Sequence, residues 1–242
     1  MGQHADRNAQ FEKIAELKQH SLEAGRPVIS IDTKKKELLG NFYRDGVTDG
    51  IEPTVVNDHD FPSASSGKVI PHGICDLARN EASLHLNSSR DTSELACESI
   101  ELWWREQGPP CRRVAGSLRW WRQQQCVAIL VQRGFAGTIE PAGTENSHSH
   151  YLPYCSKYNP IEHRVFPHVT RACKGVPLET IETAKHYIEK TETTTGLNVV
   201  VRIIDKVYET GRKYAEDFKK MMTIEFDKHL PKWNYTAIPD TI

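Results

Sequence analysis

Apolar side chains recur at two different spacings in the first part of the chain and predict a helix followed by strands. Residues 8–24 carry them at roughly helical spacing, and Gly25 followed by Pro27 ends the segment. The run PVISID alternates β-branched side chains, and with ELLGNFY across the charged turn TKKK it predicts a hairpin. GKVIPHGICDL and ASLHLN predict two further strands joined by a turn at Arg79 and Asn80. The sheet is therefore expected to form from the early part of the chain.

Helical patterns dominate the later part of the chain. Thr92 and its two neighbours offer N-caps for a helix whose apolar face continues up to Gly108. Asn159, with Pro160 at the first helical position, begins NPIEHRVFPHVTRAC, a helix that Pro167 must interrupt. LETIETAKHYIEKTE predicts another helix, GLNVVVRIID a strand and GRKYAEDFKKMMTIEFDKHL a long helix. Strands first and helices later predict an α/β (α+β) fold with a mixed sheet.

The stretch 109–149 follows neither spacing. It contains no Lys, Asp or Tyr, and its Trp, Arg, Gln and Gly residues fit neither helical nor strand periodicity. So long an irregular insert is unusual in a compact domain. The stretch therefore needs an explanation of its own.

Composition narrows the class of protein. The 31 Lys and Arg residues balance 32 Asp and Glu residues, which argues against binding of nucleic acid by bulk charge but leaves room for a local basic patch. No apolar run approaches the roughly 18 residues of a membrane span, and the start MGQHAD lacks a signal peptide, so we expect a cytoplasmic protein. The six cysteines form no CxxC pair, and the histidines and cysteines of 148–173 fit no standard zinc spacing.

Two acidic residues are candidates for chemistry. Asp32 closes a β-branched run, where Asp is depleted, so it indicates either a ligand or a cap of the following turn. Glu162 lies in the first turn of a predicted helix, where simple capping is the alternative role. Two acids on separate elements are typical of a site for divalent metal ions.

Several segments together resemble the DDE transposases of bacterial insertion sequences, within the RNase-H-like integrase superfamily. They are SIDTKKKELLGNF, VNDHDF, GKVIPHGICDLARN, LPYCSKYNPIEHR and GRKYAEDFKK, and the resemblance covers nearly the whole chain outside 109–149. It implies an RNase-H-like mixed sheet flanked by helices, in which two strand aspartates and a helix glutamate hold two Mg²⁺ or Mn²⁺ ions. Motif match assigns the first acid to Asp32 and the third to Glu162, in NPIEH.

The second acid of this pattern is missing, because no Asp occurs between Asp91 and Asp205. Trp has a single codon, so WWRQQQ at 120–125, translated one base later, gives two glycines, a small or acidic residue and three Asn or Ser residues. With suitable codons, VAGSLRWWRQQQ becomes LLVLCDGGGSNS, which resembles the family's strand and its Asp. We interpret 109–149 as out of frame in a pseudogene copy, with the central strand and following helix disrupted. The alternative is an authentic, divergent loop.

This interpretation divides the chain into two parts. Residues 1–26 are expected to be a remnant N-terminal helix from which the DNA-binding region is missing. Residues 27–242 are expected to form the RNase-H-like DDE catalytic domain, irregular over 109–149. Without its second carboxylate, this domain is expected to be inactive and poorly folded.

The resemblance implies metal-dependent DNA strand cleavage and strand transfer during transposition. The partners would be insertion-sequence ends and target DNA, and a homo-oligomer is compatible with it. Candidate DNA contacts are the cations near the two acids, for which a solvated surface is the alternative role: Lys34, Lys35, Lys36, Lys157 and Arg164. Two other functions compete: a non-catalytic DNA-binding remnant that interferes with intact transposase, and a nuclease for RNA–DNA hybrids.

Overall fold

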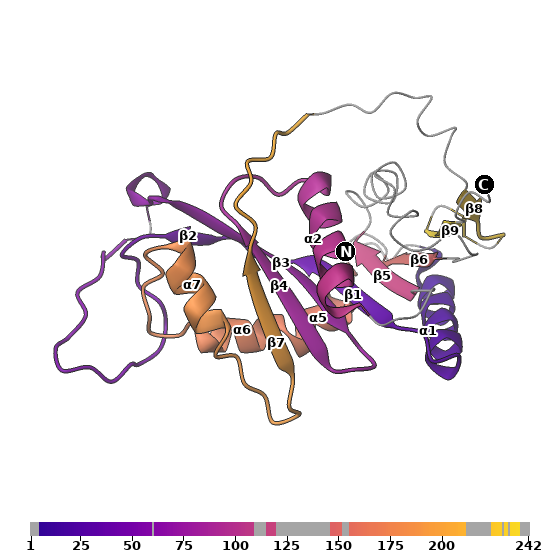
Figure 1. Cartoon of the computed structure of the whole chain (residues 1–242), viewed down its shortest axis with the longest axis horizontal. Helices are drawn as coiled ribbons and strands as arrows, with labels where there is room; N and C mark the ends of the chain where they lie inside the picture. Colours follow the sequence, from indigo (N-terminus) through magenta and orange to yellow (C-terminus); the bar gives the residue numbers. More distant parts are fainter. Residues whose placement is uncertain are drawn as a thin grey trace.

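The chain builds one mixed sheet with helices on both faces (Figure 1). The computed structural model describes residues 5–59, 61–108, 115–119, 146–151, 155–211, 224–228, 230–231 and 233–237. The helices are α1 (Arg7–Glu23), α2 (Ser93–Gln107), α5 (Pro160–Arg164), α6 (Phe166–Ala172) and α7 (Ile181–Ile188), with short 3-10 turns η1 (Pro62–Ala64) and η2 (Ser156–Tyr158). The strands are β1 (Val28–Thr33), β2 (Glu37–Leu39), β3 (Gly67–Asp76), β4 (Glu81–Asn87), β5 (Ala115–Arg119), β6 (Asn146–Tyr151), β7 (Asn198–Ile203), β8 (Ile224–Phe226) and β9 (Asn234–Ala237).

The strand order is β7-β4-β3-β1-β5-β6-β9-β8, and β2 pairs with β3 outside this path. β3 is antiparallel to both β1 and β4, whereas β5 is parallel to both β1 and β6. Three antiparallel strands followed by two parallel ones, in the order β4-β3-β1-β5-β6, form the predicted RNase-H-like sheet. β7 extends one edge in parallel with β4, and β9 with β8 extends the other edge antiparallel.

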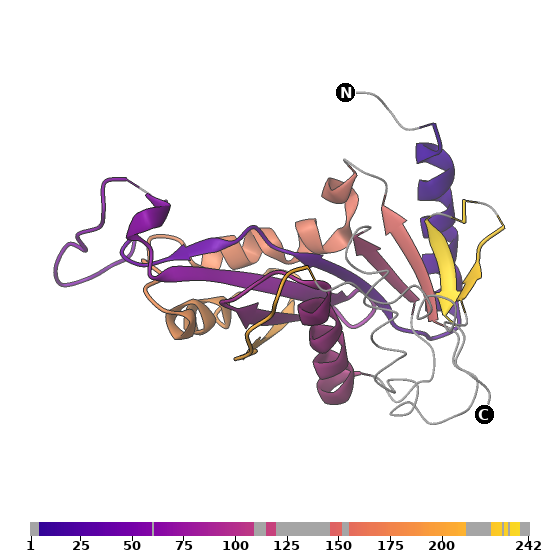
Figure 2. The same cartoon turned by 90° about the horizontal axis from the view of Figure 1, so that it is seen from above.

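The two faces of the sheet are covered by different helices (Figure 2). On one face, α2 packs Cys97, Ile100 and Trp103 against Ile29 and Ile31 of β1. Successive strand side chains point to opposite faces, so Ser30 and Asp32 point to the other face. That second face is covered by α5, α6 and α7, whose apolar side chains form the largest cluster of the described core with β3, β4 and β7.

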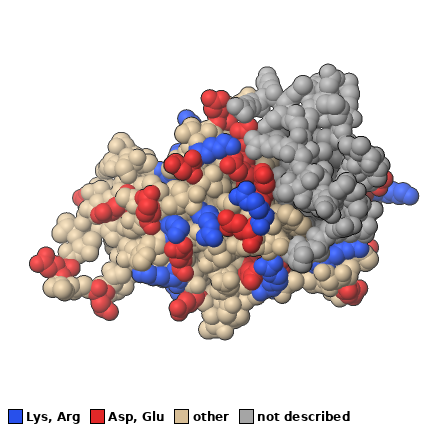
Figure 3. Space-filling view, in the orientation of Figure 1, with Lys and Arg blue, Asp and Glu red and all other residues tan. Residues whose placement is uncertain are grey.

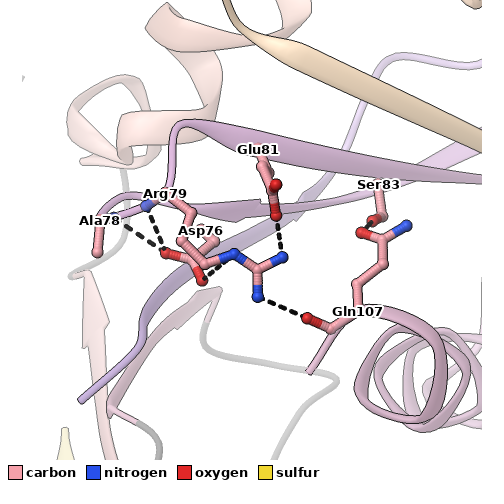
Figure 4. Close-up of polar contacts among 6 residues, drawn as sticks. All are labelled: Asp76, Ala78, Arg79, Glu81, Ser83 and Gln107. Atoms are coloured by element: carbon pink, nitrogen blue, oxygen red, sulfur yellow. Dashed lines mark hydrogen bonds and ion pairs between the residues drawn. The ribbon is translucent and has the colours of Figure 1, made fainter. Parts of the chain in front are cut away.

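The turn between β3 and β4 forms where the sequence predicts it, and it is fixed to α2 (Figure 4). The buried Asp76 carboxylate accepts hydrogen bonds from the amide N–H groups of two turn residues, at 2.9 and 3.1 Å. Asn80 has a positive φ of 54°, a conformation that Asn tolerates better than most residues. Arg79 pairs with Glu81 and donates to the carbonyl of Gln107 at the end of α2, at 2.6 Å. The polar groups of the turn therefore also position α2.

Most of the predicted elements are present, but the predicted hairpin between PVISID and ELLGNFY is wrong. β1 and β2 do not pair with each other; β1 pairs with His72–Asp76, and β2 pairs with Gly67–Val69. β3 has ten residues, which is long enough to pair with β2 along its first part and with β1 along its last part. The predicted long C-terminal helix is also wrong in part, since Ile224–Phe226 form β8, while 212–223 lie outside the described residues.

The segment 109–149 contributes to the sheet. Its residues Ala115–Arg119 form β5, and Asn146–Tyr151 begin within it and form β6, while the rest lies outside the described residues. The frameshift interpretation concerns the coding DNA and stays a prediction. Across the described ranges, no helix combines the length and apolar character needed to cross a membrane.

The N-terminal helix is packed onto the sheet, where it contacts β1, β5 and β6. The buried amide of Gln10 donates to the carbonyl of His150, at 2.8 Å, and exchanges hydrogen bonds with the amide of Asn234, at 3.0 and 2.8 Å. These bonds join α1 to β6 and β9, so residues 5–26 belong structurally to the sheet domain.

Candidate active site at the junction of β1 and α5

Asp32 lies near the end of β1, between β3 and β5 in the sheet order, and only 2% of it is exposed. Its Oδ1 accepts the amide N–H of Thr33 at 2.8 Å. Its neighbour on β3 is Gly73, where an added Cβ would come within 2.7 Å of Ile161 and 2.8 Å of Phe166. The absence of a side chain at Gly73 therefore lets α5 and α6 approach the sheet beside Asp32.

The first turn of α5 is joined to β1 by a buried hydrogen-bond network. The Asn159 amide nitrogen donates to the carbonyl of Ile31 at 3.0 Å and to Oδ2 of Asp32 at 3.4 Å. The Ser30 hydroxyl donates to the Asn159 amide oxygen at 2.5 Å, and it accepts the N–H of Ile161 at 3.0 Å. Two segments far apart in the sequence are thus held together at Asp32.

Glu162 follows Ile161 in this same helical turn. Ile161 is fully buried in the core formed with β3 and β4, which fixes the turn against the sheet. Glu162 is half-buried, and its N–H donates to the carbonyl of Asn159 at 3.0 Å. Asn159, which contacts the Asp32 carboxylate, therefore lies only three positions before Glu162, which carries the second candidate carboxylate.

β5 brings a third position to this junction. Ser117 lies beside Ser30 in the parallel pairing of β1 with β5. The pairing ends there, two residues before Asp32 on β1 and two residues before Arg119, the last residue of β5. β1 is therefore joined to β5 by backbone pairing and to α5 by the hydrogen bonds of Asn159.

The family is decided by a match along nearly the whole chain. The model of a family described as the Rhodopirellula transposase DDE domain matches residues 1–239. The chain belongs to this transposase family. The transposase resemblance found in the motifs is thereby confirmed, while the truncation and the frameshift stay predictions.

Other comparisons add little to this transposase assignment. The crystal structure of the Mos1 mariner paired end complex with Mn matches 78% of this chain and 56% of that chain, with a TM-score of 0.49 and 11% sequence identity. This chain therefore spans about half the length of the Mos1 protein. Comparison with curated proteins finds no match.

The junction offers only part of the metal-binding set that the transposase resemblance implies. Asp32 and Glu162 supply carboxylate oxygens, the donors that Mg²⁺ prefers and Mn²⁺ accepts. Arg119 is the last residue of β5, at the position that the frameshift interpretation assigns to Asp. Within the described ranges, no group of three or more His, Cys, Asp or Glu side chains is arranged to hold a metal ion. Asp32 and Glu162 therefore have the donor chemistry of metal ligands, and their joint binding of a metal ion stays a prediction.

The three lysines after β1 occupy different environments in the transposase fold. Lys34 is buried and pairs with Glu37, which Arg44 also contacts at 3.0 Å. Burial alone would raise the pKa of Glu37, but the hydrogen bonds and charges of Lys34 and Arg44 outweigh it and hold the pKa below its ordinary value. Lys35 and Lys36 are exposed, so they are the two that face solvent.

The remaining predicted DNA contacts flank Glu162 in the sequence. Lys157, in η2, is exposed and lies 5.1 Å from the centre of the Tyr158 ring. Arg164 ends α5, is exposed and donates to the carbonyl of Leu77 at 3.4 Å. Both cations therefore lie on the same short stretch as Glu162.

The residues that join β1 to α5 could not be predicted from the sequence. Asn159 is the N-cap residue of α5, as predicted, but its side chain does not cap the helix and instead binds β1. Ser30, a buried polar residue inside a β-branched run, was the one local signal of such a contact. A buried hydroxyl needs a hydrogen-bond partner, but the sequence does not say where that partner lies.

Proposed function

We propose that this chain is the catalytic domain of an insertion-sequence transposase, whose ancestral reaction is metal-dependent cleavage and strand transfer of DNA, and that this copy is inactive. The observation that carries the proposal is the hydrogen bond from Asn159 to Asp32. It draws the first turn of α5, with Glu162, to the end of β1, as a shared metal site requires. Family membership supports the reaction class.

Each residue has a chemical task in this proposal. Asp32 and Glu162 would hold Mg²⁺ or Mn²⁺, and two such ions would supply activation of the attacking oxygen and stabilisation of the leaving oxygen. Asn159 orients the Asp32 carboxylate, because one of its oxygens receives the amide hydrogen bond. Lys35, Lys36 and the cations beside Glu162 would neutralise DNA phosphates.

The proposed inactivity is attributed to Arg119, the last residue of β5. An arginine supplies no oxygen ligand for a divalent cation. Asp32 and Glu162 alone would hold a metal weakly. A chain that keeps the fold and exposed cations without complete metal ligation could still bind DNA, so the second candidate function is a non-catalytic remnant that competes with intact transposase.

The decisive experiment compares this chain with one whose 109–149 segment is translated in the shifted frame, on DNA carrying the element ends. The restored chain is expected to cleave with Mg²⁺, and the present chain is not. Asp32→Ala and Glu162→Ala are expected to abolish cleavage by the restored chain. Cleavage that survives either substitution would remove the metal-site assignment.

A sequence test precedes that experiment. The coding DNA for 109–149, translated in its second frame, is expected to encode an Asp followed by glycines and then a helix. A second frame without this pattern would overturn the frameshift proposal. Binding of element ends by the present chain, without cleavage, would support the competing-remnant function.

A further inference from the structure

An exposed tyrosine lies beside the buried network at Asp32. Tyr158 ends η2 and directly precedes Asn159, whose amide contacts the Asp32 carboxylate. Asn159 is almost completely buried, whereas Tyr158 is 39% exposed. The turn is fixed at this point, because the Tyr158 N–H donates to the carbonyl of Cys155 at 3.0 Å. A ring that solvent can reach therefore lies one residue from the side chain that orients Asp32.

Two cations from different parts of the chain lie over this ring. Arg7, in α1, places its guanidinium carbon 5.4 Å from the centre of the Tyr158 ring and donates to the Tyr158 hydroxyl at 2.9 Å. Lys157 places its ammonium nitrogen 5.1 Å from the same centre. Both distances are typical of cation–π attraction. In the described part of the chain, neither cation forms an ion pair with an acidic side chain. Both charges can therefore serve a bound phosphate.

Helix α1 holds the ring and one of the cations in place. Phe11, one turn after Arg7, lies 5.7 Å from the Arg7 guanidinium and meets the Tyr158 ring edge-on, with ring centres 5.0 Å apart at 86°. Phe11 also contacts Tyr151 at the end of β6, with ring centres 5.8 Å apart. In both ribbon views α1 lies at the end of the sheet that carries β5 and β6 (Figures 1 and 2). Because Gln10 bonds α1 to the sheet, the cation and the ring are positioned before any ligand binds.

An exposed ring beside two cations suits an unpaired nucleotide. In sites for single-stranded nucleic acid, bases stack on aromatic side chains while cations bind the phosphates. The bases of a duplex are already stacked on one another, so a duplex can use only the phosphate contacts. On the face that Figure 3 shows, Lys and Arg are interspersed with Asp and Glu over the described part of the surface. General surface charge therefore adds little affinity, and particular contacts have to supply it.

We propose that Tyr158, Arg7 and Lys157 form a subsite for one unpaired nucleotide of single-stranded DNA, next to the bond that is cut. The base stacks on the Tyr158 ring in place of the Lys157 ammonium, which moves on its flexible stem to a phosphate. Arg7 keeps its bond to the Tyr158 hydroxyl and contacts the neighbouring phosphate. The position next to the cut bond rests on the proposed function, whereas the binding of single-stranded DNA does not.

Binding of a fluorescent oligothymidylate to the full chain, without divalent ions, tests this subsite. Tyr158→Leu keeps an apolar contact with Phe11 but removes the aromatic face, so it is expected to raise the dissociation constant by at least about fivefold. Tyr158→Trp keeps an aromatic face and is expected to keep the affinity. The matched control is Tyr43→Leu, at an exposed tyrosine between β2 and β3, which should leave the affinity unchanged. Circular dichroism confirms the fold of each variant.

Salt and strandedness separate stacking from charge. Arg7→Gln and Lys157→Gln should each lower the slope of log affinity for the single strand against log salt by about 0.7. Tyr158→Leu should weaken binding of a duplex of the same length far less than binding of the single strand. An equal loss on both, or a Tyr158→Leu variant that binds the single strand like the native chain, would overturn the proposal.

The subsite and the proposed reaction fail in different experiments. A native chain that does not bind the oligothymidylate would overturn the subsite without bearing on the metal ligands. A restored chain that binds the oligothymidylate through Tyr158 but does not cleave would contradict the reaction and support the subsite.

Discussion

The side-chain amide of Asn159 donates a hydrogen bond to the carboxylate of Asp32, and it thereby joins the first turn of α5 to the end of β1. Both residues are almost completely buried. The same amide also binds the carbonyl of Ile31 and the hydroxyl of Ser30. One side chain therefore fixes the relative position of the strand and the helix that carry the two candidate metal ligands.

Replacement of Asn159 by Ala should destabilise the fold. The change leaves the buried polar groups of Ser30 and Ile31 without their amide partner, and the expected loss is about 2–4 kcal/mol in the free energy of unfolding. Urea denaturation of the full chain measures it. The control is Asn198→Ala, at an exposed position of β7, which should change stability by less than about 0.5 kcal/mol. Equal losses in the two variants would contradict the role of the network.

Replacement of Gly73 by Ala should push α5 away from the sheet. The new Cβ would lie 2.7 Å from Ile161 and 2.8 Å from Phe166, both buried. Overpacking of this kind costs about 1–3 kcal/mol. Gly67→Ala, in the same strand, is the matched control, because its Cβ would meet only Leu39, at 4.0 Å. Thermal unfolding of both variants tests the prediction, and equal melting temperatures would contradict it.

These two positions show what the sequence could and could not predict. The order of strands and helices followed from periodicity, because each element shows its own spacing of apolar residues. Asp32 and Glu162 were identified by motif, but spacing along the chain does not tell that their elements meet. The role of Asn159 depends on β1, which is distant in sequence. The residues around Asn159 therefore predicted only an N-cap. The hairpin prediction was wrong for a related reason. It assumed that β1 and β2, which are neighbours in sequence, pair with each other, whereas both pair with β3.

Two buried histidines should make the fold sensitive to acid. His72 and His85 face each other on β3 and β4. Burial lowers the pKa of His72 to about 4, against the charge of Asp91, and burial with the charges of His72 and Arg202 lowers the pKa of His85 to about 3. From about pH 6.5 downward the unfolded chain binds protons that the folded chain does not. Stability should therefore fall as the pH falls from 6.5 towards 4.

The measurement is urea denaturation at pH 7, 6 and 5. Each buried histidine contributes a slope of at most about 1.4 kcal/mol per pH unit in this window. The variant His72→Leu should show a shallower dependence than the native chain, because one of the two titrating groups is gone. An unchanged slope would mean that His72 is protonated in the folded chain. Above pH 7 the native chain should show no histidine-dependent change.

Of the three lysines after β1, Lys34 should stabilise the fold, whereas Lys35 and Lys36 should bind DNA. Lys35→Ala and Lys36→Ala should each lower the slope of log affinity for duplex DNA against log salt by about 0.9, because each removes one phosphate contact. Lys34→Ala should leave this slope unchanged and destabilise the fold, since Lys34 is buried and pairs with Glu37. Gel-shift titrations at several salt concentrations test this. Identical slopes in all three variants would contradict the assignment.

We propose that Asp32 and Glu162 belong to one divalent-metal site, which lacks a third carboxylate because position 119 is occupied by Arg. Its most direct test is Mn²⁺ binding, followed by electron paramagnetic resonance, to the chain carrying Arg119→Asp. This variant is expected to bind Mn²⁺ at least about tenfold more tightly than the native chain, a gain of about 1.4 kcal/mol, and further replacement by Asp32→Asn or Glu162→Gln is expected to remove the gain. Tight Mn²⁺ binding that survives both replacements would contradict a shared metal site at Asp32 and Glu162.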